Sequence, residues 1–249
     1  YNEYMELGLR YPPTFTQVST TEEAAQVLRS TVIDLVICMP GNADNDAFDV
    51  ARDIKGKFPN IHCVVLTPFS HGITKRMQNE DLSIFDYVFC WLGNTNLILS
   101  IIKLIEDKMN LEHDIHEAGV QMILLVEDSI RFYSSILPNL YNYILEQSKN
   151  FSKEALNRHA ATMRMRGRPK VVLARTYEEA KKLYDKYSNN TLGVISDARF
   201  PLKSAARAFG NEVDEDVKPE YGTDTFGREK CPDAGLQLFR YIRKHDSFV

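Results

Sequence analysis

The sequence predicts an α/β protein built around parallel sheets, and three observations support this. Short runs rich in aliphatic residues, such as 122–126 and 191–196, are typical of strands that are buried on both faces. These runs alternate with segments of helical periodicity along the 249 residues, which favours strand–helix–strand units. The order strand, Thr, Glu-Glu-Ala, helix, strand also occurs twice, beginning at Val18 and at Leu173. The sequence therefore predicts two copies of one α/β unit.

The first copy is predicted to extend over residues 1–115. Thr20 followed by Glu22 and Glu23 is typical of a capped helix N-terminus, where acids lie at the positive end of the helix dipole. Pro12-Pro13 ends the preceding helix, and Pro40-Gly41 ends a strand. The expected helices are 1–10, 20–30, 48–57, 73–79 and 95–109, and the expected strands are 15–18, 33–39, 62–67 and 87–92.

The second copy is predicted to extend over residues 116–249, after a polar joint at 112–119. Residues 203–232 are rich in Gly, Asp and Glu and poor in large aliphatic residues, which predicts a mobile loop. The expected strands are 122–126, 171–174 and 191–196, and the expected helices are 130–149, 152–165, 177–187 and 235–244.

Composition limits the classes of function. A hydrophobic content of 44% and a charged content of 26% are those of a globular protein, and no apolar run approaches the ~20 residues that span a bilayer. The net charge of -4 implies no general attraction to nucleic acid or to an anionic membrane. Cys38, Cys63 and Cys90 lie in apolar runs, where free thiols behave as small hydrophobes. We therefore expect a cytoplasmic protein with no nucleic-acid or membrane partner, and the start at Tyr1 suggests a piece of a longer chain.

Three acids follow two of the predicted strands. Glu127 and Asp128 come directly after the strand at 122–126, and Asp197 comes directly after the strand at 191–196. The carboxyl ends of parallel strands meet at one edge of a sheet, which is where sites form in such folds. Like charges this close raise each other's pKa unless a cation neutralises them, and carboxylate oxygens suit Mg²⁺. The sequence thus predicts a magnesium site, although strands also end in acids simply because the following loops are solvated.

These residues stand in a pattern that resembles the receiver domain of bacterial response regulators. The pattern comprises Leu125-Val-Glu-Asp-Ser129, Asp197 with Pro201 four residues later, and Asp233-Ala-Gly before an amphipathic helix. The resemblance implies flavodoxin-like, doubly wound parallel sheets. It also implies that Glu127, Asp128 and Asp197 bind Mg²⁺. Asp197 would accept a phosphoryl group from a histidine kinase or phosphotransfer protein, as in two-component phosphorelay signalling, so turnover catalysis is not expected.

Both copies depart from this family pattern. The first lacks the first strand with its acidic pair and has Met39 where the acceptor aspartate belongs, which makes it a pseudo-receiver. Its Thr67 matches the family's hydroxyl position, and Cys90 lies near the position of the family's lysine. The second copy is truncated after its third helix, so its own switch hydroxyl and lysine are expected to be missing.

Several alternatives follow from these departures. If neither copy is phosphorylated, the chain is a structural interaction scaffold. The chain also resembles the regulatory front of enzymes like pyruvate-phosphate dikinase or phosphoenolpyruvate synthase, with an attached C-terminal effector or catalytic region. A Mg²⁺-dependent phosphohydrolase is disfavoured, since Arg199 stands where that class has a second aspartate. In a permuted fold, the strand at 122–126 would insert into the first sheet.

A basic run at residues 163–170, Met-Arg-Met-Arg-Gly-Arg-Pro-Lys, has two interpretations. It could contact phosphates or an acidic partner. More often such a run is a solvated helix end whose basic residues oppose the negative end of the helix dipole.

Overall fold

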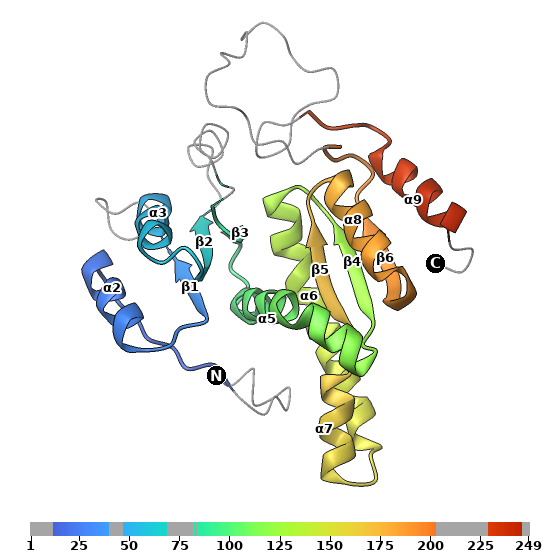
Figure 1. The fold of residues 1–249 in the computed structure, drawn as a ribbon, viewed down its shortest axis with the longest axis horizontal. Helices are drawn as coiled ribbons and strands as arrows, with labels where there is room; N and C mark the ends of the chain where they lie inside the picture. Colours follow the sequence, from blue (N-terminus) through green and yellow to red (C-terminus); the bar gives the residue numbers. More distant parts are fainter. Residues whose placement is uncertain (1–11, 40–46, 69–81, 83, 203–228, 246–249) are drawn as a thin grey trace, which may run out of the picture.

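The computed structural model describes residues 12–39, 47–68, 82, 84–202 and 229–245, and within them the chain forms two separate three-stranded parallel sheets (Figure 1). The strand orders are β1-β2-β3 and β5-β4-β6. The predicted α/β class with two parallel sheets is confirmed, and the permuted alternative is wrong because β4 lies in the middle of the second sheet.

The elements of the first part are α2 (Thr21–Ser30), β1 (Leu35–Cys38), α3 (Ala47–Lys57), β2 (His62–Pro68), β3 (Tyr87–Trp91) and α5 (Asn96–Ala118). Those of the second are β4 (Met122–Val126), α6 (Ile130–Lys153), α7 (Arg158–Arg166), β5 (Lys170–Ala174), α8 (Tyr177–Tyr187), the 3₁₀ turn Ser188–Asn190, β6 (Thr191–Ser196) and α9 (Ala234–His245).

The structure has both of the capped helix N-termini that the sequence repeat predicts. Thr20 caps α2 by accepting a hydrogen bond from the backbone N–H of Glu23, and the Glu23 carboxylate accepts one from the N–H of Ser19. Thr176 caps α8 in the same way, by accepting from the N–H of Glu179. These reciprocal bonds satisfy donors that a helix N-terminus leaves without intrahelical partners. The strand predicted at 15–18 is wrong, since this segment forms no strand, and the helices predicted at 1–10 and 73–79 lie outside the described residues.

The central strand of the second sheet, β4, is buried on both faces, because successive side chains of a strand point to opposite faces. Met122, Leu124 and Val126 pack with α8 and α9, whereas Leu125 packs on the opposite face with α6. These four of the five side chains of β4 are almost fully buried. The continuous apolar run of this strand is therefore explained by cover on both sides. The expectation that 191–196 is buried on both faces is wrong, since Leu192 and Ile195 of β6 are exposed.

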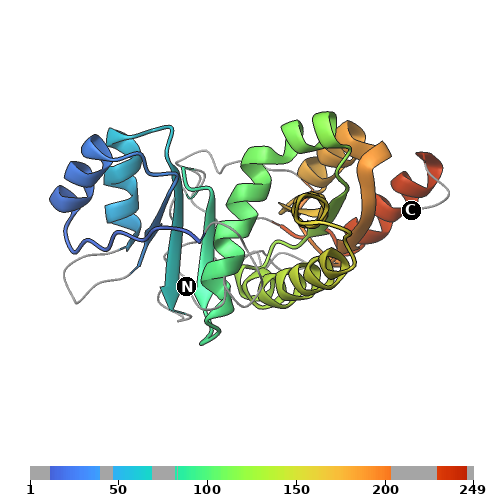
Figure 2. The same cartoon turned by 90° about the horizontal axis from the view of Figure 1, so that it is seen from below.

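Helix α5 lies between the two sheets (Figure 2) and contacts strand β5 of the second. The polar joint predicted at 112–119 is helical: α5, which was expected to end at 109, continues to Ala118. It ends at Gly119, which has the left-handed backbone conformation. The reason is tertiary: Leu111 and Ile115 are buried in the core of the second sheet. The division into residues 1–115 and 116–249 stays a prediction, since one hydrophobic core includes Leu66 of the first sheet and Leu173 of the second.

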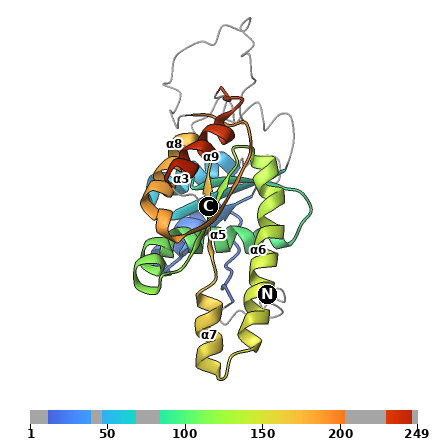
Figure 3. The ribbon, with the colours of Figure 1, turned by 90° about the vertical axis from the view of Figure 1, so that its right-hand side faces the viewer.

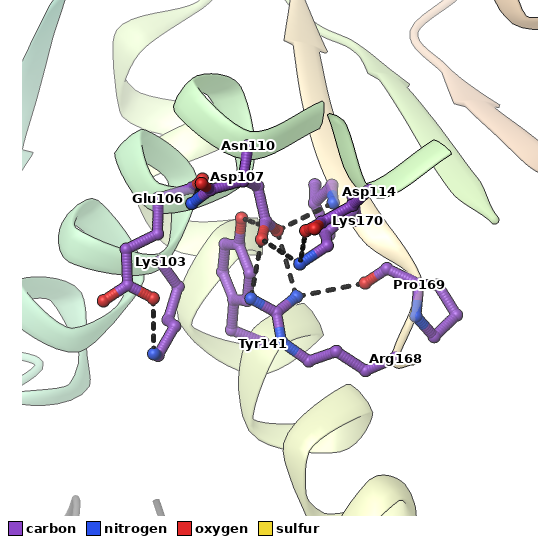
Figure 4. A network of polar contacts seen from close by, with 10 residues as sticks. Lys103, Glu106, Asp107, Asn110, Asp114, Tyr141, Arg168, Pro169 and Lys170 are labelled. Atoms are coloured by element: carbon purple, nitrogen blue, oxygen red, sulfur yellow. Dashed lines mark hydrogen bonds and ion pairs between the residues drawn. The ribbon is translucent and has the colours of Figure 1, made fainter. Parts of the chain in front are cut away.

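A buried polar cluster joins α5, α6 and β5 (Figure 4). Asp107 of α5 is fully buried and accepts two hydrogen bonds from the guanidinium of Arg168, at 2.6 and 3.0 Å. It also accepts from the hydroxyl of Tyr141 on α6 and from the backbone N–H of Val171 in β5, both at 2.9 Å. Burial raises the pKa of the Tyr141 hydroxyl well above its usual value, and the neighbouring Asp107 charge adds to that rise. One carboxylate thus connects three elements from both parts of the chain.

Helix α6 also seals an edge of the first sheet. The hydroxyl of Tyr133 donates to the carbonyl of Val88, and the hydroxyl of Ser134 accepts from the N–H of Cys90 at 2.9 Å. Unpaired backbone groups on an edge strand are an open template for association, and side chains of α6 occupy these two on β3.

No helix in the described part of the chain has the length and apolar character needed to cross a bilayer. Cys38, Cys63 and Cys90 are free and buried, as expected.

Candidate metal centre

The three acids predicted from the sequence lie together at the carboxyl edge of the second sheet. Backbone hydrogen bonds that continue the parallel ladders past the strand ends position two of them. The N–H of Glu127 donates to the carbonyl of Ala174 at 3.0 Å, and the N–H of Asp197 donates to the carbonyl of Val126 at 2.9 Å. Each acid is therefore fixed to the neighbouring strand at the point where its own strand ends.

The spacing of the carboxylates suits a single small cation. Glu127, Asp128 and Asp197 each offer an oxygen, and these oxygens lie within 4.8 Å of one another. Opposite ligands of one Mg²⁺ are about 4.2 Å apart, since each Mg–O bond is about 2.1 Å. Small side-chain rotations would thus bring the three oxygens onto one ion. The donor set, carboxylate oxygens only, matches the hard ligands that Mg²⁺ prefers.

Burial differs among the three acids. Asp128 is fully buried and Glu127 is 6% exposed, whereas Asp197 is only partly covered. Asp197 is therefore the acid most open to an incoming group. Its Oδ1 accepts a hydrogen bond from the N–H of Ala198 at 2.6 Å, which fixes the carboxylate orientation.

Burial raises the pKa of Glu127 to about 7. The nearby charges of Asp197 and Asp128 raise it further, and a hydrogen bond from the N–H of Ser129 partly opposes the rise. Crowded carboxylates take up a proton when no cation is present, because the neutral form avoids the repulsion. This perturbation is the behaviour expected of a site adapted to a cation.

A lysine lies at the same edge of the sheet, although the sequence pattern did not predict one there. The Nζ of Lys230 is 2.8 Å from Oδ2 of the buried Asp128. Lys230 follows residues 203–228 in the sequence, so no spacing rule connects it to the strand ends. Its segment is held in place because the N–H of Cys231 donates to the carbonyl of Phe200, forming an antiparallel bridge. Within the predicted loop, the segment 229–232 is thus attached to Phe200 through Cys231, and residues 203–228 lie outside the described part of the chain.

Gly235, in the first turn of α9, packs directly on the backbone of Asp197. A Cβ atom at this position would lie 2.3 Å from the carbonyl oxygen of Asp197 and 3.1 Å from Cα of Ala198. The N–H of Gly235 donates to the carbonyl of Ala198 at 3.0 Å. Only glycine permits this approach, which explains why Asp233-Ala-Gly forms part of the pattern at this site.

Among the described residues of the first part of the chain, the corresponding positions carry no comparable site. Met39 is 58% exposed and offers no carboxylate. Thr67 is buried, and its hydroxyl donates to the carbonyl of Pro68. Burial raises the pKa of the Cys90 thiol to about 11, so this side chain is neutral and apolar in character.

Comparisons with known proteins give no independent assignment: no family model, curated protein or solved structure matches this chain. The case for a function therefore depends on the site itself.

Proposed function

We propose that this chain is a receiver module of a phosphorelay, in which Asp197 accepts a phosphoryl group with Mg²⁺ held by Glu127, Asp128 and Asp197. The observation that carries the proposal is the convergence of three carboxylate oxygens within 4.8 Å at one sheet edge. The order β5-β4-β6, with the acidic pair after the central strand, agrees with a flavodoxin-like receiver sheet. We propose the flavodoxin-like receiver fold for the second sheet as part of the same hypothesis.

The proposed reaction is a transfer between two side chains. A carboxylate oxygen of Asp197 attacks the phosphorus of a phosphohistidine on a kinase or phosphotransfer protein. The P–N bond breaks, the imidazole nitrogen leaves and takes up a proton, and an acyl phosphate forms on Asp197. Mg²⁺ would neutralise negative charge on the transferred oxygens, so that most of the catalysis is positioning and electrostatics.

Residues of the chain itself would supply the nucleophile, the metal ligands and an additional positive charge. Asp197 is the accessible nucleophile, whereas the buried Asp128 and Glu127 stay behind it as ligands. Lys230 adds a positive charge at the same edge through its ion pair with Asp128. The result of phosphorylation would be regulation of an attached or partner protein.

The test is labelling by a small phosphodonor. With acetyl phosphate and Mg²⁺, the chain should gain one phosphoryl group on Asp197, detected by peptide mass spectrometry. Asp197→Asn should abolish the label, and Asp128→Asn should weaken both the label and Mg²⁺ binding measured by calorimetry. Asp53→Asn is the matched control, because Asp53 is an exposed carboxylate on α3 that forms an ion pair with Lys57, far from the acidic site. Wild-type chain that neither binds Mg²⁺ nor takes a label would refute the proposal.

One observation favours a second candidate, a scaffold that is never phosphorylated. The Lys230–Asp128 ion pair already neutralises one buried carboxylate without a metal ion. In that case Lys230→Met should destabilise the chain by removing the positive charge 2.8 Å from the buried Asp128, and added Mg²⁺ should not restore stability. If Mg²⁺ does restore it, the metal site is supported instead.

A further inference from the structure

A helical arm projects from the second sheet, away from the acidic site. Helix α6 begins beside the carboxyl end of β4 and has 24 residues, about 36 Å of helix, whereas the five residues of β4 extend about 17 Å. The helix therefore continues past the opposite edge of the sheet. Its last buried residue is Ser148, and α7 returns alongside it (Figures 1 and 3). The connection between α6 and α7 forms the end of this arm.

Three large apolar side chains are exposed near the end of the arm. Leu156, in the connection, is 100% exposed, Phe151 is 55% exposed and Met163 is 53% exposed. The guanidinium of Arg164 lies 4.2 Å from the centre of the Phe151 ring and donates to the Phe151 carbonyl, so the two helices are joined there. Single exposed apolar residues are ordinary, but a group of them on a projecting end suggests a contact surface.

The arm is also basic. Residues 147–167 contain five Lys or Arg and a single acid, Glu154, a local net charge of +4 in a chain whose net charge is -4. Of the basic run 163–170, Arg168 and Lys170 are not part of this surface, since both are buried and paired with Asp107 or Asp114. Lys153 and Arg166 are exposed, and Lys149 and Arg164 are partly exposed, so these four present positive charge at the surface of the arm.

We infer that the end of this arm binds an anionic membrane surface, with Leu156 and Phe151 entering the interface and the basic residues contacting lipid headgroups. A convex end needs a matching groove on a protein partner, whereas the bilayer interface is deformable and needs none. Membrane binding of this kind combines buried apolar area with attraction of Lys and Arg to anionic lipid. Nucleic acid fits less well, because a phosphate backbone gives Leu156 no apolar contact and Arg164 already covers a face of Phe151.

The experiment is co-sedimentation of the full chain with phosphatidylcholine vesicles, with and without phosphatidylserine. We expect binding only to vesicles that contain phosphatidylserine, decreasing as salt shortens the Debye length from about 8 Å at physiological ionic strength to about 3 Å at 1 M. Leu156→Ser should lower the partition coefficient about tenfold through lost apolar burial. Lys153→Gln should lower it about fivefold through one lost basic residue.

Matched controls lie outside the arm. Val32 is 91% exposed and Lys182 is exposed on α8, so Val32→Ser and Lys182→Gln make the same chemical changes elsewhere and should leave binding unchanged. Equal loss in arm and control variants would overturn the inference, as would the absence of any dependence on phosphatidylserine. Tighter binding to duplex DNA, with the same dependence on Lys153, would overturn it in favour of a nucleic-acid surface. Because the arm is distant from Asp197, these outcomes are independent of the labelling test.

Discussion

Substitution of Asp107 should destabilise the chain more than loss of any surface ion pair. Asp107 is fully buried and Arg168 is 7% exposed, so Asp107→Ala leaves a guanidinium buried without its counter-charge. Removing one partner of a buried ion pair costs about 3–5 kcal/mol. Tyr141 and the N–H of Val171 lose their acceptor in the same change. We therefore expect the free energy of unfolding to fall by at least about 3 kcal/mol, a large part of the roughly 5–15 kcal/mol typical of a domain.

Urea denaturation measures this change. With a slope of about 2 kcal/mol per molar urea, a loss of about 3 kcal/mol lowers the midpoint by about 1.5 M. Asp53→Ala is the control, since Asp53 forms an exposed pair with Lys57 and its loss should cost at most about 1 kcal/mol. The double substitution Asp107→Leu with Arg168→Met should recover much of the stability, because well-packed apolar residues can replace a buried pair. If Asp107→Ala shifts the midpoint no more than Asp53→Ala does, the buried Asp107 cluster contributes little to the free energy of unfolding, and the reasoning is refuted.

Three further predictions concern the site and the edge of the first sheet. Burial raises the pKa of Glu127 from 4.5 to about 7, so the metal-free native state binds more protons than the unfolded state between these values. The free energy of unfolding should therefore fall by as much as about 3 kcal/mol as pH rises from 4.5 through 7, and Glu127→Gln should remove this component from urea titrations across the window. Gly235→Ala should displace the backbone of Asp197, because its Cβ would lie 2.3 Å from that carbonyl oxygen; phosphoryl labelling should drop while helix content by circular dichroism is kept. Ser134→Ala should cost about 1–3 kcal/mol in thermal or urea unfolding by leaving the buried N–H of Cys90 unsatisfied, whereas the same change at the next residue, an exposed serine, should be neutral.

The elements that the sequence predicted well are those defined by local chemistry. The apolar run at 122–126 and the caps at Thr20 and Thr176 each leave a signal within a few residues, and the structure has β4, α2 and α8 at those places. The convergence of Glu127, Asp128 and Asp197 was also predictable, because topology alone brings the ends of adjacent parallel strands together.

The features that the sequence did not reveal all depend on distant contacts. Arg168 belongs to a run that resembles a solvated basic surface, yet its guanidinium is buried against Asp107, 61 residues earlier. Residues 112–119 look polar, but α5 continues through them because one side of the helix packs on the second sheet. Lys230 reaches Asp128 only through the fold of the segment after β6. Local propensity and spacing contain no information about such pairings.

The two sheets are linked through the helix that begins at the candidate site. Helix α6 starts two residues after Asp128, and within its first two turns Tyr133 and Ser134 bind backbone groups of β3 in the first sheet. Charge added or removed at the acidic pair therefore acts at the N-terminus of a helix whose dipole responds to nearby anions. Further along the same helix, the hydroxyl of Tyr141 donates to Asp107, before the helix extends beyond the sheet as the arm. The first sheet is therefore a surface against which the start of α6 is fixed, through hydrogen bonds to the backbone of β3.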